Sequence, residues 1–198
     1  GLISLPAYWS AGLPPHLALG TNKFSSCFGT IFSTAHYFHA RMIDIPVALL
    51  SAVFALLGSS LGTSAVLLLS PDFLNYLLVF LIPIVAVISL LNRNLGLKNR
   101  ANVLKLGFRL SLGSLAGLVI GFYDGFFGPG TGTFLILIYA SLMHYDFVQA
   151  NGNTKVVNLA SNVAALITFA INGSVFLPLA IPGALCGILG NILGAKLV

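Results

Sequence analysis

Long apolar segments separated by short polar turns run through most of this chain. They predict seven helices, at about residues 17–40, 44–69, 73–91, 106–124, 130–144, 148–171 and 175–198. Several of these segments approach the roughly 20 residues that a helix needs to cross the hydrocarbon layer of a bilayer. The pattern therefore predicts an all-α polytopic membrane protein that is embedded in the lipid bilayer.

The predicted segment at 130–144 is short for a membrane span. A glycine-rich stretch separates it from the segment before it and reads Gly128-Pro129-Gly130-Thr131-Gly132. Glycine and proline in such a run end a helix and turn the chain. The two segments on either side therefore form either a re-entrant hairpin or a broken crossing, and the sequence leaves both open.

Two lysines, Lys23 and Lys155, follow similar stretches, and the 132-residue offset between them aligns further residues without a gap. The further matches are Pro46 with Pro178, Gly58 with Gly190, Leu61 with Leu193 and Gly62 with Gly194. Ordered matches at one spacing, mostly of prolines and glycines, favour two copies of one backbone design over chance similarity of two apolar sequences.

The two copies divide the chain into a first transmembrane repeat at 1–91, a basic linker at 92–105 and a second transmembrane repeat at 106–198. The offset pairs the short segment at 130–144 with residues 1–12. It puts the counterpart of 106–130 before the first residue and that of 73–91 after the last one. We therefore expect each repeat to be incomplete and the chain to be part of a longer protein.

Composition and charge agree with a membrane location. The chain is 58% hydrophobic and 7% charged, with a mean hydropathy of +1.01, which excludes a water-soluble domain. The net charge of +5 does not indicate a nucleic-acid partner, because five of the nine cations lie in or beside the linker: Arg93, Lys98, Arg100, Lys105 and Arg109. Cations in a short loop mark the cytoplasmic side of a membrane protein. We expect a multi-pass protein of the inner (plasma) membrane with this linker in the cytoplasm.

With the linker inside, the helix that carries Lys23 runs inward and the helix that carries Lys155 runs outward. The two copies are then inverted repeats, a usual architecture of secondary transporters. Small residues also predict close helix packing at two places, Gly58-Ser59 with Gly62 and Gly113 with Ala116-Gly117.

Each copy has a lysine near the head of a membrane-length apolar stretch, where an ammonium is costly and is seldom kept without a role. Glycine with threonine or asparagine at a helix start can point backbone N–H groups at an anion, and the helix dipole favours negative charge there. We predict a site for a small anionic solute at the repeat interface, formed by Gly20, Thr21, Asn22, Lys23, Gly130, Gly132, Asn153, Thr154, Lys155 and Asn158. The alternative is that both lysines extend to the lipid headgroups and bind nothing.

Polar residues continue the predicted site along both helices. Asn158 and Asn162 lie on one helical face with Lys155, and their equivalents in the first copy are Ser26 and Thr30. A polar stripe in each copy suits a solute path, and it suits hydrogen bonds between helices equally well.

Asp124 is the one acid that falls within a long apolar run, beside the glycine-rich break. A carboxyl group there can take up and release protons, or it can pair with a lysine. Proton coupling through Asp124 is therefore a hypothesis beside a structural ion pair.

The segments Gly12–Lys23 and Gly121–Gly132, together with Asn153-Thr154-Lys155, resemble the sulfite exporter TauE/SafE family of membrane transporters. The resemblance covers essentially the whole chain. It implies a two-repeat carrier of the inner membrane that exports small anions such as sulfite, sulfonates or related organic acids. Members differ in substrate, so the resemblance leaves the solute open.

Two other classes of protein remain open. His36 and His39, spaced i and i+3, could reach one metal in a metal-dependent intramembrane enzyme, although no third ligand is apparent and interfacial histidines are more often belt residues. A non-transporting subunit of a membrane complex predicts that both lysines tolerate replacement. We expect a transporter that is no enzyme and holds no cofactor or metal, and we leave open a coupling proton or cation and homo-oligomerisation.

Overall fold

The computed structural model describes residues 2–91 and 101–196, and within these ranges the chain folds into helices without a β-strand. The elements are α1 (Ser4–Ser10), α2 (Pro15–His39), α3 (Ile45–Leu67), α4 (Pro71–Leu91), the 3₁₀ turn η1 (Ala101–Val103), α5 (Leu106–Phe126), α6 (Thr131–Leu137), the π-helical turn η2 (Ile138–Leu142), α7 (Phe147–Ile171) and α8 (Leu177–Lys196). All seven predicted segments are helical, with ends within a few residues of those expected. The all-α prediction is confirmed.

Within the described residues, four helices are long and apolar enough to cross a membrane: Ile45–Leu67, Leu106–Phe126, Phe147–Ile171 and Leu177–Gly194. α2 is as long, but it buries polar residues such as Thr21 and Lys23. Large apolar side chains such as Leu57 of α3, Leu115 of α5 and Leu185 of α8 are instead exposed. An apolar exterior marks a membrane-facing surface, so the chain is a polytopic membrane protein that keeps much of its polarity inside.

Local sequence signals set the helix starts. The side chains of Asp44 and Asp146 cap α3 and α7, since they accept hydrogen bonds from the backbone N–H groups of Val47 at 3.5 Å and Gln149 at 2.8 Å. Pro15 occupies the first turn of α2, where its missing N–H removes no helical hydrogen bond.

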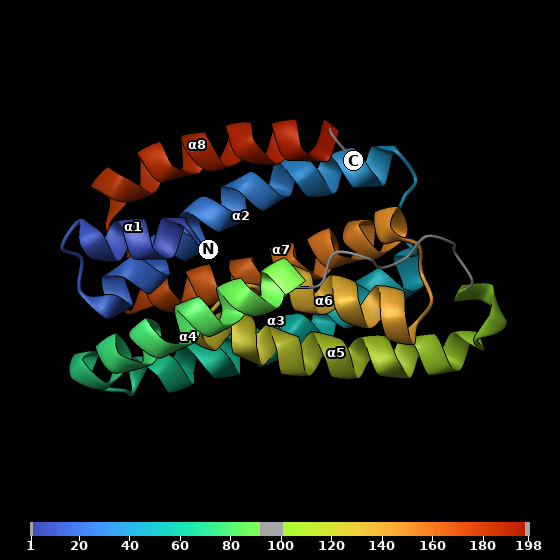
Figure 1. Cartoon of the computed structure of the whole chain (residues 1–198), viewed down its shortest axis with the longest axis horizontal. Helices are drawn as coiled ribbons and strands as arrows, with labels where there is room; N and C mark the ends of the chain where they lie inside the picture. The colour runs from blue at the N-terminus through green and yellow to red at the C-terminus, as the bar shows by residue number, and fades with distance from the viewer. Residues whose placement is uncertain (1, 92–100, 197–198) are drawn as a thin grey trace.

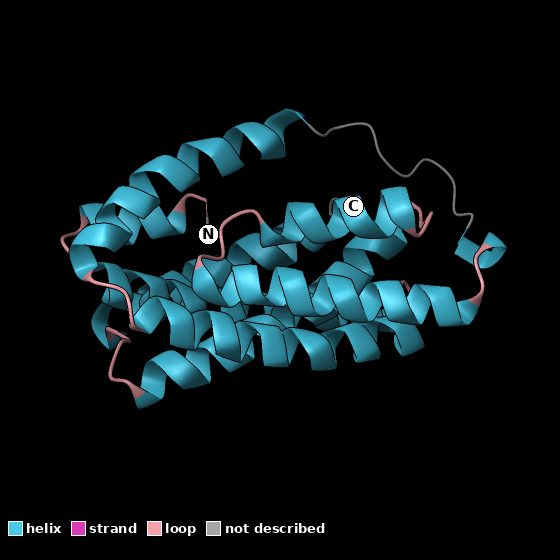
Figure 2. Ribbon diagram, turned by 90° about the horizontal axis from the view of Figure 1, so that it is seen from below, coloured by secondary structure: helices cyan, strands magenta, loops and turns pink. Residues whose placement is uncertain are grey.

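The long helices lie roughly along one axis, with most connections at its two ends (Figures 1 and 2). α3 packs beside α5 and α7, and α8 packs beside α2. α2 and α7 run in opposite directions (Figure 1): Lys23 in the first half of α2 hydrogen-bonds Asn162 in the second half of α7, whereas Thr34 late in α2 donates to the carbonyl of Lys155 early in α7.

Small residues let α3 and α5 approach closely. Gly117 and Gly125 of α5 face the backbone carbonyls of Ser51 and Ser59 in α3, and a Cβ added at either glycine would overlap the carbonyl oxygen. Gly58 of α3 meets the backbone of α5 in the same way. The close packing predicted for the small-residue clusters is confirmed.

The 132-residue offset recurs in the structure. Shifted by 132 positions, the bounds of α2 become residues 147 and 171, which are the bounds of α7. A Cβ added at Gly20 would overlap the carbonyl oxygen of Ser174, and one added at Gly152 would overlap that of Met42. Because the offset converts Gly20 into Gly152 and Met42 into Ser174, one contact occurs twice with the two halves of the chain exchanged.

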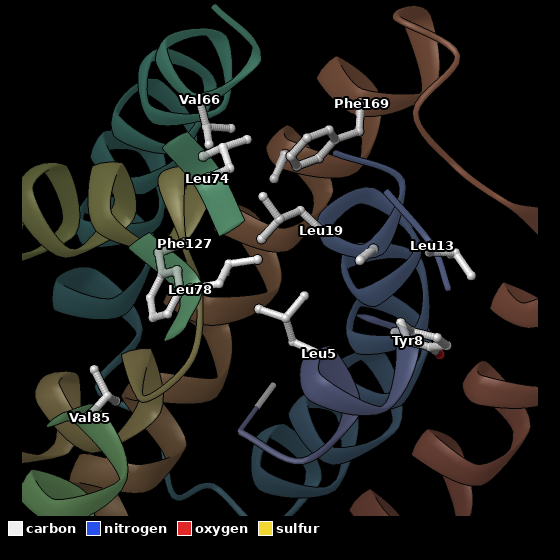
Figure 3. Close-up of a cluster of buried hydrophobic side chains, with 12 residues drawn as sticks. Leu5, Tyr8, Leu13, Leu19, Val66, Leu74, Leu78, Val85, Phe127 and Phe169 are labelled. Carbon is white, nitrogen blue, oxygen red and sulfur yellow. The ribbon is translucent and has the colours of Figure 1, made fainter. Parts of the chain in front are cut away.

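A cluster of buried apolar side chains joins α1 and α4 to the central helices. Leu5, Leu19, Leu78, Phe127 and Phe169 meet in it (Figure 3). Phe127 directly follows α5, so the cluster also fixes the point at which the glycine-rich break begins.

The break turns the chain back on itself. Gly128 and Gly130 have φ angles of 96° and 83°, a region that glycine adopts without strain. α6 then returns alongside α5 (Figure 1), and after η2 the Tyr145 hydroxyl accepts a hydrogen bond from Arg109, near the start of α5, at 3.1 Å. The two segments therefore form a helical hairpin, and its second arm is an apolar helix shorter than the four helices of membrane-spanning length.

Candidate functional site

A polar cavity of about 210 Å³ lies between α2, α7 and α8, and the glycine-rich break closes another side of it. Its charged lining residues are Lys23, Lys155 and Asp124. Its other lining residues are Asn22, Ser26, Thr30, Gly128, Gly130, Thr131, Gly132, Asn158, Asn162 and Asn191. The fold thus brings both lysines, the acid and the glycine-rich break to one place, although they come from distant parts of the sequence.

Lys23 is buried in the interior of α2, with 2% of its side chain exposed. Its Nζ lies 2.9 Å from Asp124 Oδ1 and donates to Asn162 Oδ1 at 3.3 Å. A Cβ added at Gly128 would come within 3.0 Å of the same Nζ, so the absence of a side chain there leaves room for the ammonium. The alternative in which Lys23 extends to the headgroups is therefore wrong.

Asp124 has partners on both of its carboxylate oxygens. Oδ1 accepts from the Thr131 hydroxyl at 2.7 Å and faces Lys23, and Oδ2 accepts from the Ser161 hydroxyl. Three separate helices, α2, α6 and α7, thus converge on this carboxylate at the end of α5. Of the two uses considered for Asp124, the pairing with a lysine is present.

Lys155 has a different environment from its sequence counterpart. It is half-buried in α7, and among the described residues its Nζ makes no hydrogen bond or ion pair. Because α2 and α7 are antiparallel, it lies about seven helical positions from the level of Lys23, or about 10 Å along the bundle. The two lysines therefore line one cavity at different depths, with one paired and one unpaired.

The predicted helix-start arrangement at the lysines is wrong. Gly20 and Lys23 lie inside α2, which begins at Pro15, and Gly152 and Lys155 lie inside α7. Backbone N–H groups in a helix interior bond to carbonyls one turn earlier and cannot point at an anion. Gly20 instead lets α2 pack against the backbone carbonyl of Ser174.

Two other predicted site residues bond the protein backbone. Thr21 Oγ1 accepts from the N–H of Phe176 at 3.0 Å, just before α8, and Asn153 Oδ1 accepts from the N–H of Asp44 at 2.8 Å, just before α3. The two pairs are related by the 132-residue offset. Each side chain therefore bonds the residue that precedes a helix in the other half of the chain, and neither residue is among those that line the cavity. Thr154 is buried near the cavity, and its hydroxyl has no partner within the described residues.

Several residues of the site were missed by the sequence analysis. Thr131 and Ser161 bond the Asp124 carboxylate, and Asn191 of α8 lines the cavity. The usable signal for Asn191 was a single amide within an otherwise apolar helix. Thr131 lies within the glycine-rich stretch, between two predicted site residues. For Ser161 no pattern in the sequence was informative, because small hydroxyl residues are common in membrane helices.

A second polar cluster lies at the opposite end of α5. Arg109 Nη1 is 2.7 Å from Asp44 Oδ2, and the hydroxyl of Tyr145 donates to the same oxygen at 2.6 Å. Burial, reinforced by the Asp44 carboxylate, raises the pKa of the Tyr145 phenol, so it stays protonated as a donor. This cluster ties together the starts of α3 and α5 and the turn before α7.

No group of three or more potential metal-ligating side chains occurs among the residues that the structure describes. His39 Nδ1 lies 2.7 Å from the carbonyl oxygen of Ala35, and the His36 ring packs edge-on against Tyr37. Both described cysteines, Cys27 and Cys186, are free thiols.

Comparison with known proteins finds one family whose profile covers the whole chain. The profile of the family described as sulfite exporter TauE/SafE matches residues 1–198. A "Probable membrane transporter protein" of Haemophilus influenzae is 33% identical over 198 residues, which is all of this chain and 76% of the relative. The "Probable membrane transporter protein YfcA" of Escherichia coli K12 is 30% identical over all of this chain and 72% of the relative. The "Probable membrane transporter protein ORF9" of Sinorhizobium sp. is 37% identical over 201 residues, 99% of this chain and 72% of the relative.

No solved structure matches the chain at a significant level. The match to the family profile nevertheless extends from the first residue to the last, and it includes every residue of the polar cavity. The chain therefore belongs to the sulfite exporter TauE/SafE family.

Proposed function

We propose that this chain is the core of a membrane transporter that exports small anions, and that the cavity around Lys23 and Lys155 is its solute site. The observation that carries the proposal is a polar cavity holding two ammonium groups inside a bundle with an apolar exterior. Lysines at membrane depth are costly and mark solute paths. The relatives are named as probable membrane transporters, and the family description, which mentions sulfite, suggests sulfite or a related oxyanion as the solute.

We also propose that the two copies, at 1–91 and 106–198, are inverted repeats. The antiparallel course of α2 and α7 and the contacts repeated with the copies exchanged support this arrangement. Ser26 and Asn158, which the offset relates, both line the cavity. A solute site on the symmetry axis between repeats is the usual arrangement in secondary transporters.

The orientation with a cytoplasmic linker at 92–105 in the inner membrane is part of the proposal. Residues 92–100, with three of the five cations, lie outside the described residues. A single cysteine introduced in this stretch, with the exposed Cys186 changed to alanine, should react with an impermeant maleimide only after the membrane is opened. Labelling in intact cells would mean that the linker lies outside the cell and that the proposed orientation is wrong.

The function is tested with the full-length protein in lipid nanodiscs and proteoliposomes. Sulfite, methanesulfonate, sulfate and acetate are screened for thermal stabilisation and for saturable flux. The Lys155→Met variant should lose anion binding, whereas Lys105→Met, which removes an equal charge from an exposed position, should bind as the unmodified protein does. Absence of anion binding and flux in the unmodified protein would overturn the proposal, and bound metal in purified protein would favour the enzyme alternative.

A further inference from the structure

We infer that the cavity carries one uncompensated positive charge, on Lys155, and that it therefore selects oxyanions with a single negative charge. Lys23 then acts as a positioning group that stays with Asp124 and does not bind the solute. This inference rests on the proposed function and specifies the chemistry of its solute.

The charge count comes from the lining residues. Three charged side chains face the cavity, and two of them, Lys23 and Asp124, form an ion pair at 2.9 Å with only 2% and 3% of their side chains exposed. The pair is neutral as a whole. Lys155 is the remaining charge, and its ammonium has no partner within the described part of the chain.

The surroundings of Lys23 hold it in the pair. Its ammonium is enclosed by Asp124, Asn162 and the backbone at Gly128. If Lys23 turned to a solute, the Asp124 carboxylate would remain buried with only the hydroxyls of Thr131 and Ser161 as partners. A buried charge without its counter-ion is strongly unfavourable, so the solute takes the lysine that is free.

The neutral lining fits the oxygen atoms of a small oxyanion. The Thr30 hydroxyl donates to the carbonyl of Ser26 at 2.7 Å, which leaves the amides of Asn22, Asn158 and Asn191 and the hydroxyl of Ser26 among the neutral side chains that line the cavity. Such groups donate hydrogen bonds to carboxylate or sulfonate oxygens without adding charge. A single anionic charge is therefore balanced by Lys155, whereas the second charge of a dianion would have no counter-charge among the lining residues.

Selection of a monoanion over a dianion is tested with two tetrahedral sulfur anions that differ in charge. Methanesulfonate carries one negative charge and sulfate carries two at pH 8. Binding of both is measured calorimetrically on the full-length protein in nanodiscs. The unmodified protein should prefer methanesulfonate by about tenfold or more, which is about 1.4 kcal/mol.

Variants that change the charge count test the assignment. Asp124→Asn raises the cavity charge to two and should shift the preference toward sulfate by about tenfold or more. The double variant Lys23→Met with Asp124→Asn restores a single charge and should keep the preference for methanesulfonate, even if both affinities fall a few fold. Lys155→Met should lose binding of both anions, with Lys105→Met as the control of equal charge.

The double variant keeps the test decisive if Asp124→Asn alone fails to fold. Loss of all anion binding in a folded double variant would mean that Lys23 binds the solute and would overturn the inference. Equal affinity of the unmodified protein for both anions, or normal binding by Lys155→Met, would overturn it as well. Each of these results leaves anion transport standing, whereas the absence of any binding by the unmodified protein overturns the proposed function itself.

Discussion

Removal of the buried ion pair one partner at a time should show how strongly Lys23 and Asp124 depend on each other. Their charged atoms are 2.9 Å apart and both side chains are almost fully buried. At an effective dielectric constant of about 20, two unit charges at that distance attract by roughly 6 kcal/mol. The desolvation of both ions opposes this attraction, so the pair as a whole contributes far less.

The single variants should therefore be much less stable than the double variant. Lys23→Met leaves a buried carboxylate and Asp124→Asn leaves a buried ammonium, and each should lower the free energy of unfolding by about 3–5 kcal/mol. The double variant leaves no charge and should lie within about 1–2 kcal/mol of the unmodified protein. A double-mutant cycle built from these three variants should then give a coupling energy of at least about 3 kcal/mol between Lys23 and Asp124, well above the range for exposed ion pairs.

The assay is equilibrium unfolding in mixed detergent micelles, followed by tryptophan fluorescence and repeated at two salt concentrations. The pair of Arg109 and Asp44 is an internal comparison, because its atoms are 2.7 Å apart but its side chains are 13% and 15% exposed. Its cycle should give a smaller and more salt-sensitive coupling. Additive effects of Lys23→Met and Asp124→Asn would refute the reasoning, since they would mean that the two groups do not interact in the folded protein.

Three further predictions concern packing, capping and coupling. Gly117→Ala should lower the free energy of unfolding by about 1–3 kcal/mol, because the added Cβ would overlap the backbone of α3. The control Gly190→Ala adds a Cβ in open space and should be neutral or stabilising by up to about 1 kcal/mol. Equal melting temperatures of the two variants would contradict this prediction. Thr21→Val and Asn153→Ala each remove the hydrogen bond to the backbone N–H that precedes a helix in the other half of the chain. Each should lower the free energy of unfolding, measured by thermal unfolding, by about 1 kcal/mol. The control Thr21→Ser keeps the accepting hydroxyl and should lose less stability. If Asp124 couples transport to protons, flux of the Asp124→Asn variant should lose its dependence on pH, and an unchanged pH profile would exclude that role.

Much of the fold follows from patterns that are local in the sequence. Apolar runs of about membrane-spanning length locate seven segments, and the glycine-rich stretch at 128–132 locates the break between α5 and α6. The repeated spacing anticipates that α2 and α7 have equivalent bounds, since the bounds of the two helices differ by the same 132-residue offset. The small residues at Gly58 and Gly117 anticipate the close approach of α3 and α5 for a steric reason that needs no knowledge of the partner.

The candidate site was only partly accessible in this way. The sequence singled out both lysines and Asp124, because an ionised group in an apolar run is costly wherever its partner lies. It wrongly put Gly20 and Gly152 at helix starts, since glycine before threonine or asparagine also occurs inside helices that pack tightly. Pro15 and Asp146, the residues that begin these helices, are the more reliable local signals.

Tertiary structure alone decided which charge is compensated. Lys23 and Lys155 stand in nearly the same sequence context, and the 132-residue offset gives them the same position in α2 and α7. Asp124 belongs to another helix and reaches Lys23 because the break after α5 ends beside α2, with Thr131 and Ser161 holding the carboxylate in place. Repetition in a sequence conveys the local design of each helix, whereas the electrostatic state of a buried group depends on contacts between segments far apart in the chain.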